Sequence, residues 1–108
     1  MGSKTDGLIE DLECFRRKIQ KRYAIERMIL FGSRARGQFK KFSDVDLIVV
    51  SRKFRRKGAI ERATPLHLEW DLDIPVDFLC YTPEEFRELS ARGGLVREAL
   101  REGISISG

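Results

Sequence analysis

Two aspartates separated by one residue, Asp44 and Asp46, are the strongest chemical signal in the chain. They stand at the start of an apolar stretch, and side chains two apart in a strand point to the same face, with Cα atoms ~6.5–7 Å from each other. Two carboxylates this close repel each other unless a positive charge lies between them. A pair of divalent cations ~3.5–4 Å apart suits them, and is the arrangement used for in-line phosphoryl displacement. Mg²⁺ prefers such oxygen ligands.

A third carboxylate, Asp77, lies in another apolar stretch between Val76 and Phe78. Strand alternation places Val76 and Phe78 on one face and Asp77 on the opposite one. If this strand lies beside the strand of Asp46, Asp77 faces the same site. There it would bind the second metal or accept the proton of an attacking hydroxyl. The alternative, an ordinary surface charge, stays open at this point.

Gly32 and Ser33 directly follow a short apolar run that ends at Phe31. A glycine there lets the backbone come close to a phosphate, and the next N–H groups with the serine hydroxyl can bond its oxygens. Arg34 and Arg36 add planar cationic donors suited to phosphate. An ordinary tight turn within an arginine-rich surface is the competing interpretation.

These parts combine into one spacing: Gly32-Ser33, ten residues, then Asp44-Val45-Asp46. With that spacing the chain resembles the minimal nucleotidyltransferase family of the DNA polymerase β-like superfamily, whose motif is Gly-Ser, ten residues, Asp-X-Asp. The resemblance covers about residues 8–103. It implies that Gly32 and Ser33 hold the phosphates of an NTP, that Asp44 and Asp46 bind two Mg²⁺ ions, and that Asp77 completes the acidic triad as a further metal ligand.

The resemblance also implies a substrate and a partner. The preference for ATP rests on the family, because nothing in the sequence reads a base. Members of the family are often encoded beside a small helical protein of the HEPN class as a toxin–antitoxin pair, in which the nucleotidyltransferase is the antitoxin and AMPylates a tyrosine of its partner. The alternative function is a non-catalytic antitoxin that neutralises its partner by forming a complex. The intact set of three carboxylates argues against it, because a pure binder does not need them.

Length and composition indicate one folded domain, residues 1–108, with 42% hydrophobic and 35% charged residues. The net charge of +4 suits phosphate-bearing ligands and is far from that of a nucleic-acid-binding arm. The chain has no run that spans a bilayer and no secretory segment, so we expect a cytoplasmic protein without membrane association. Cys14 and Cys80 are expected to be free thiols. Self-association into a homo-oligomer is left open.

The basic run from Arg52 to Gly58 is interpreted as a solvated loop rather than a polyanion-binding patch, which disfavours a nucleic-acid partner. Whether it contacts substrate stays open. The single histidine, His67, is expected to pack with Trp70 against the sheet or a partner instead of transferring protons. Four phenylalanines outside the strand runs either form a partner surface or fold onto the core: Phe39, Phe42, Phe54 and Phe86.

Hydrophobic periodicity predicts an α/β (α+β) domain in which helices flank a small mixed sheet. Helices are expected over residues 6–22, 82–90 and 95–102, the second opened by the capping box Thr82-Pro83-Glu84-Glu85. Over residues 59–73 two short helical pieces are preferred to a strand, with Thr64 as N-cap and Pro65 at N1 of the second. Strands are expected at residues 28–31, 44–51 and 76–81, a small edge strand at Ile104 and Ile106, and a turn at 32–37 that opens a short helix.

Overall fold

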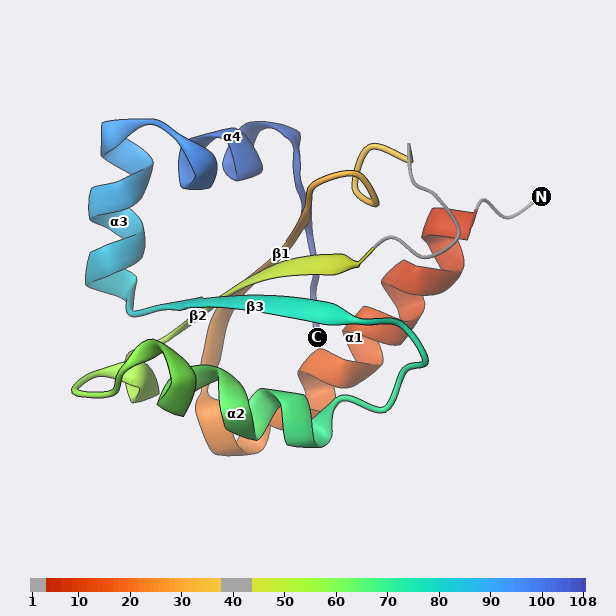
Figure 1. The fold of residues 1–108 in the computed structure, drawn as a ribbon, viewed down its shortest axis with the longest axis horizontal. Coiled ribbons are helices and arrows are strands. Elements are labelled where there is room, and N and C mark those ends of the chain that lie inside the picture. The colour runs from red at the N-terminus through yellow and green to blue at the C-terminus, as the bar shows by residue number, and fades with distance from the viewer. Residues whose placement is uncertain (1–3, 38–43) are drawn as a thin grey trace.

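The computed structural model describes residues 4–37 and 44–108, with side chains from Gly7 onward (Figure 1). Its elements follow the order α1 (Lys4–Tyr23), β1 (Ile25–Phe31), β2 (Val45–Ser51), the 3₁₀ turn η1 (Arg52–Phe54), α2 (Ala59–Glu69), β3 (Val76–Tyr81), α3 (Pro83–Arg92), α4 (Leu95–Glu102) and β4 (Ile104–Ser105). None of the helices in this part of the chain is long and apolar enough to cross a membrane.

The strands form one sheet with the order β3-β2-β1-β4 in the described part of the chain. β2 and β3 are parallel, whereas β1 is antiparallel to both of its neighbours, β2 and β4. The sheet is therefore mixed, as predicted. α2 provides the crossover that a parallel pair requires between β2 and β3.

One face of the sheet is covered by α1 and α2. The apolar residues of α1 recur at helical spacing, so that Leu8, Leu12, Phe15 and Ile19 all face inward and are buried. Phe78 of β3 is surrounded by rings on this face, with ring centroids 4.9 Å from His67, 5.8 Å from Phe15 and 5.9 Å from Trp70. The expectation that the histidine and the tryptophan pack against the sheet is confirmed.

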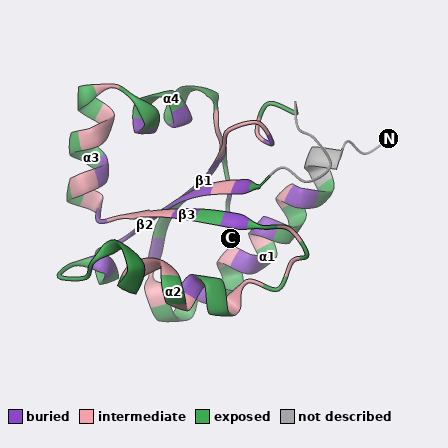
Figure 2. Ribbon diagram, viewed as in Figure 1, coloured by how far each residue is buried: buried purple, intermediate pink, exposed green. Residues whose placement is uncertain are grey.

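The opposite face is covered by α3 and α4 and holds a smaller core: Ile29, Ile48, Val50, Phe86, Val96 and Ala99. The predicted capping box begins α3, where the Thr82 hydroxyl accepts from the Glu85 N–H and the Glu85 carboxylate accepts from the Thr82 N–H. Gly93 and Gly94, with φ of +88° and +89°, separate the two helices. In β2 every residue except Asp46 is buried, and Figure 2 shows helices with both buried and exposed positions along their length.

Three predicted boundaries differ from the structure. Residues 59–73 contain one helix, α2, which runs through Pro65 to Glu69, so Thr64 is not an N-cap and Pro65 is not at N1. Proline removes one N–H from the helix, but Leu66 next to it is fully buried, and this packing outweighs the local preference. Residues 32–37 form turns without a helix, and β1 begins at Ile25, three residues before the predicted start.

The predicted loop phenylalanines divide into two groups. Phe54 and Phe86 are 1% and 7% exposed, which shows that these two fold onto the core. Phe39 and Phe42 lie outside the described residues. Both cysteines are free thiols, as expected, with Cys14 exposed and Cys80 half-buried.

Candidate active site

The end of β1 and the beginnings of β2 and β3 lie at the same end of the sheet. Because β1 and β2 are antiparallel, Phe31 at the end of β1 is the register partner of Asp46 near the start of β2. Because β2 and β3 are parallel, Asp77 near the start of β3 is the register partner of Asp46 on its other side. Asp44 immediately precedes β2. The condition for convergence, that the strand of Asp77 lies beside that of Asp46, is therefore met.

The carboxylates lie on the sheet face that α3 and α4 cover. Neighbours of Asp46 and Asp77 in their strands, Val45 and Phe78, belong to the core under α1 and α2, so alternation turns the two aspartates to the opposite face. Asp46 is half-buried, whereas Asp44 and Asp77 are exposed. Asp46 and Asp77 thus share one face at the end of the sheet, and Asp44 is near enough for its charge to act on Asp46.

Among the described residues, the charges that shift the pKa of Asp46 are negative. The pKa of Asp46 is raised above its ordinary value of 3.8, first by desolvation and then by the like charges of Asp77 and Asp44. The two neighbours are therefore close enough for their charges to act on Asp46. Such a group gains most from a cation or from a proton held at that point.

Gly32 gives the carboxylate of Asp46 its space. Its φ of +77° lies in the left-handed region. A Cβ built on it would lie 2.6 Å from Oδ2 of Asp46, which is closer than real contacts allow. Glycine was expected at this position so that a phosphate could approach. The structure adds a second reason that the sequence does not contain, namely close contact with the carboxylate.

In the turn after β1 the exposure of the side chains changes from one residue to the next. Ser33 is half-buried beside Gly32, and the Gly32 carbonyl accepts a hydrogen bond from the Arg36 N–H at 3.4 Å. Arg34 is only 7% exposed and is engaged in an interaction inside the protein. The guanidinium of Arg36 is exposed and lies 3.9 Å from a carboxylate oxygen of Glu102. Of the two predicted phosphate-binding arginines, Arg36 is the accessible one.

A hollow of about 130 Å³ opens beside this turn, between the end of β1 and α4. The residues around it include Phe31, Gly32, Arg36, Leu95, Glu98 and Glu102. The sequence does not predict this hollow, because it depends on where α4 lies relative to β1. A partial signal was present, since Leu95, Glu98 and Glu102 recur at helical spacing on one face of a predicted helix.

The donor chemistry of the site suits a divalent cation, because carboxylate oxygens are the ligands that Mg²⁺ prefers. Among the described residues, no three His, Cys, Asp or Glu side chains lie close enough together to hold a metal ion by themselves. A cation at Asp46 would therefore need further oxygen ligands, such as those of a bound phosphate.

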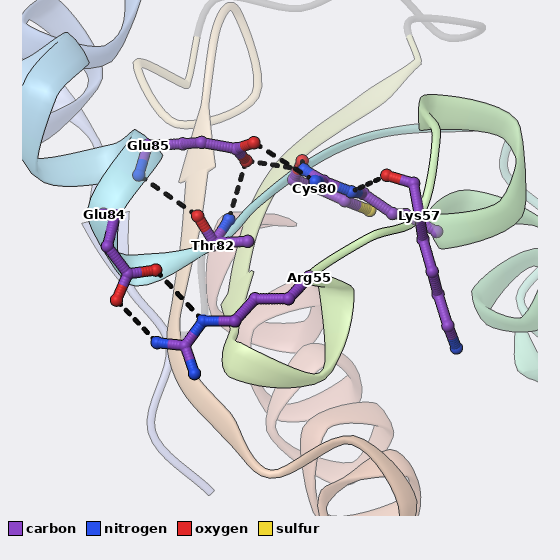
Figure 3. A network of polar contacts seen from close by, with 7 residues as sticks. Arg55, Lys57, Cys80, Thr82, Glu84 and Glu85 are labelled. Carbon is purple, nitrogen blue, oxygen red and sulfur yellow. Dashed lines mark hydrogen bonds and ion pairs between the residues drawn. The ribbon is translucent and has the colours of Figure 1, made fainter.

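The basic run lies at the other end of β2. Ser51 lies five positions after Asp46, which corresponds to ~16 Å of strand at ~3.3 Å per residue. There Arg55 forms an ion pair with Glu84 at 2.5 Å (Figure 3). Arg62 of α2 forms an ion pair with Glu85 at 2.6 Å. The basic run therefore lies at the end of β2 that is away from Asp46.

The chain is similar to known proteins in family, in sequence and in fold. Residues 12–106 match the family model described as "Nucleotidyltransferase domain". The chain is 41% identical over 61 residues to the "Probable protein adenylyltransferase MntA" of Haemophilus influenzae, covering 55% of this chain and 54% of that protein, so it spans about half the length of that relative. A solved "putative nucleotidyltransferase" from Sulfolobus solfataricus shares the fold, with a TM-score of 0.67, 16% identity, and coverage of 94% of this chain and 80% of the other.

Proposed function

Because the chain belongs to the nucleotidyltransferase domain family, we propose that it transfers a nucleoside monophosphate, AMP from ATP, to an acceptor hydroxyl. The observation that carries this proposal is the half-buried Asp46, whose pKa is raised by desolvation and by the charges of Asp77 and Asp44 beside the Gly32 turn. An arrangement that costs stability without a ligand is typical of a site that binds one.

The three carboxylates would hold two Mg²⁺ ions. Asp44 and Asp46 supply oxygens from the start of β2, and Asp77 supplies them from β3. Bound magnesium would offset the charge of the phosphates and make the α-phosphorus easier to attack. The remaining chemistry belongs to the side chains and the backbone of this chain.

The turn after β1 would hold the triphosphate. The N–H groups that follow Gly32, together with the Ser33 hydroxyl, donate to phosphate oxygens. Arg36 adds a planar donor once its long contact with Glu102 opens, and the buried Arg34 adds positive potential beneath the turn. These contacts align the α-phosphorus with the acceptor and stabilise the charge that develops in the transition state.

In the transfer step the oxygen of the acceptor hydroxyl forms a bond to the α-phosphorus. The bond from that phosphorus to the oxygen bridging to the β-phosphate breaks, and pyrophosphate leaves in line. The hydroxyl proton passes to the carboxylate of Asp77, which is exposed at the open face and can then release it to water.

The acceptor proposed here is a tyrosine of a HEPN-class helical protein, for which the chain acts as antitoxin. Support comes from the similarity to the Haemophilus influenzae protein, whose name describes a protein adenylyltransferase. We expect the reaction in the cytoplasm, where ATP and Mg²⁺ are available and where free Cys14 and Cys80 remain reduced.

The test is incubation of the chain with α-labelled ATP, Mg²⁺ and the HEPN protein encoded beside it. Label is expected on the partner, and it is expected to disappear when Asp44→Asn replaces the wild type. Asp73→Asn is the matched control, since Asp73 is an exposed aspartate in the loop before β3. An unlabelled partner in a tight complex with the wild-type chain would refute transfer and favour the non-catalytic antitoxin.

A further inference from the structure

The hollow between β1 and α4 is lined by both apolar and charged side chains. Phe31, Gly32 and Ala99 are among the residues that line it, and Leu95 of α4, which also lines it, is 52% exposed. Gly103 fixes α4 against β1, because a Cβ on it would lie 2.4 Å from the Ala99 carbonyl oxygen and 2.8 Å from that of Leu30. Figure 1 shows α4 beside the end of β1 that leads into the turn.

The hollow and the aspartates share a wall. Gly32 lines the hollow, and the same glycine lies against the carboxylate of Asp46. A ligand whose phosphates lie at the Gly32-Ser33 turn would therefore be within reach of both. The volume of about 130 Å³ is smaller than the ~300–1,000 Å³ of pockets that enclose a whole drug-sized ligand, so one ring system fits and a complete nucleotide does not.

The polar groups of the hollow define what that ring system carries. Glu98 and Glu102 are one turn apart on α4 and both face the hollow. Ionised carboxylates only accept hydrogen bonds, so they favour a ring with an N–H donor on its edge. Phe31 and Leu95 offer apolar contact to its faces.

We propose that this hollow receives the nucleobase of the nucleoside triphosphate, and that Glu98 and Glu102 favour a base with an exocyclic amino group, such as adenine, by accepting a hydrogen bond from it. The inference rests on the proposed function and adds to it the residues that contact the base.

The first experiment compares three magnesium-bound ligands by calorimetry on the wild-type chain: inorganic tripolyphosphate, a non-hydrolysable ATP analogue, and the matching inosine analogue, in which a carbonyl replaces the amino group. The ATP analogue is expected to bind most tightly, with the inosine analogue weaker by roughly tenfold, the worth of one hydrogen bond to a charged group. Equal binding of all three would overturn the base site while leaving the phosphate site intact. No binding of any of them would refute the proposed function itself, and the base site with it.

The second experiment uses Glu98→Ala and Leu95→Asp, two exposed positions on α4 that can change without loss of the core. Each is expected to weaken the ATP analogue by at least about fivefold and to leave tripolyphosphate unchanged, and Glu98→Ala is expected to abolish discrimination against inosine. Leu100→Ala is the control, being an exposed leucine of the same helix outside the hollow. If the variants reduce transfer to the acceptor while ATP affinity stays the same, the hollow binds the acceptor and the proposal is wrong.

Discussion

At the amino ends of β2 and β3, Asp46 and Asp77 stand side by side with like charges, and desolvation and repulsion raise the pKa of Asp46. At the carboxyl ends of the same strands, each carboxylate faces a guanidinium. Glu85 accepts two hydrogen bonds from Arg62, which lowers the pKa of Glu85, and Glu84 is held in the same way by Arg55. We call the end of the β2–β3 pair with Asp46 and Asp77 the unsatisfied end, because like charges meet there. The end with Glu84 and Glu85 is the satisfied end, because each of these carboxylates is paired with a guanidinium.

Arg62 shows how complete the satisfied end is. Its guanidinium side chain is 11% exposed, and besides Glu85 it donates to the carbonyls of Lys57 and Cys80. For Asp46, which is also partly withdrawn from water, the charges of the described residues that shift its pKa are both negative, those of Asp77 and Asp44. Glu85 thus has a cationic partner that stabilises the fold. At Asp46 a bound ligand can supply the positive charge.

The largest effect is expected from Asp46→Asn, which removes the charge at the unsatisfied end and keeps its shape. Transfer is expected to fall at least about a hundredfold, because losing one preorganised electrostatic contact at a transition state costs that much. The melting temperature is expected to stay the same or to rise, since the repulsion that raises the pKa of Asp46 is removed. A thermal shift measured beside the transfer assay checks both; a large fall in melting temperature would show that Asp46 is structural.

The next effect concerns Gly32→Ala, with Gly37→Ala as its control. Both glycines have left-handed φ, +77° and +71°, so both variants carry the same backbone strain of about 1–2 kcal/mol. Only at Gly32 would the new methyl group meet Asp46; at Gly37 no described atom lies within 4 Å. Transfer by Gly32→Ala is expected to fall at least about tenfold below that of Gly37→Ala, the cost of a displaced reacting geometry. Equal rates would mean that the position of Asp46 does not depend on this contact.

The sequence predicts those features of the two ends of the strand pair that depend on residues close together in the chain. The unsatisfied end is encoded locally: two aspartates in one strand, a glycine and a serine after another, and an aspartate in an apolar run each produce a pattern within a few residues. The capping box of Thr82 and Glu85 is equally local, and both it and the bounds of β3 are confirmed.

What the sequence does not predict depends on contacts between distant segments. Arg62 and Glu85 are 23 residues apart, and nothing near either of them indicates the pair. The passage of α2 through Pro65 depends on the burial of Leu66 against the sheet, which overrides a strong local signal. The hollow beside Gly32 likewise exists only once α4 packs on β1.

At the satisfied end, Glu85→Ala is expected to lower the free energy of unfolding by about 2 kcal/mol, because it removes half of the capping box and leaves Arg62 without its charged partner. Glu88→Ala is the control, since Glu88 belongs to the same helix but forms an exposed pair with Arg92, and it is expected to change the value by less than about 0.5 kcal/mol. Urea unfolding measures both. Nucleotide binding is expected to be unchanged, and a loss of binding in Glu85→Ala would contradict the separation of the two ends.

The smallest effect is the pH dependence of the same carboxylate. Hydrogen bonds from Arg62 lower the pKa of Glu85 below its ordinary value of 4.5, so the ionised form stabilises the folded state. That contribution is complete above pH 4.5 and is lost as the pH falls through the lower pKa of the folded state. Glu85→Gln cannot ionise, so the stability difference between it and the wild type is expected to shrink as urea unfolding is repeated from neutral pH down to about pH 3. Glu84→Gln is expected to show the same trend more weakly, because its pair with Arg55 is exposed and screened by salt. A difference for Glu85→Gln that does not change with pH would mean that Arg62 is held by geometry alone and that charge compensation does not distinguish the two ends of the strand pair.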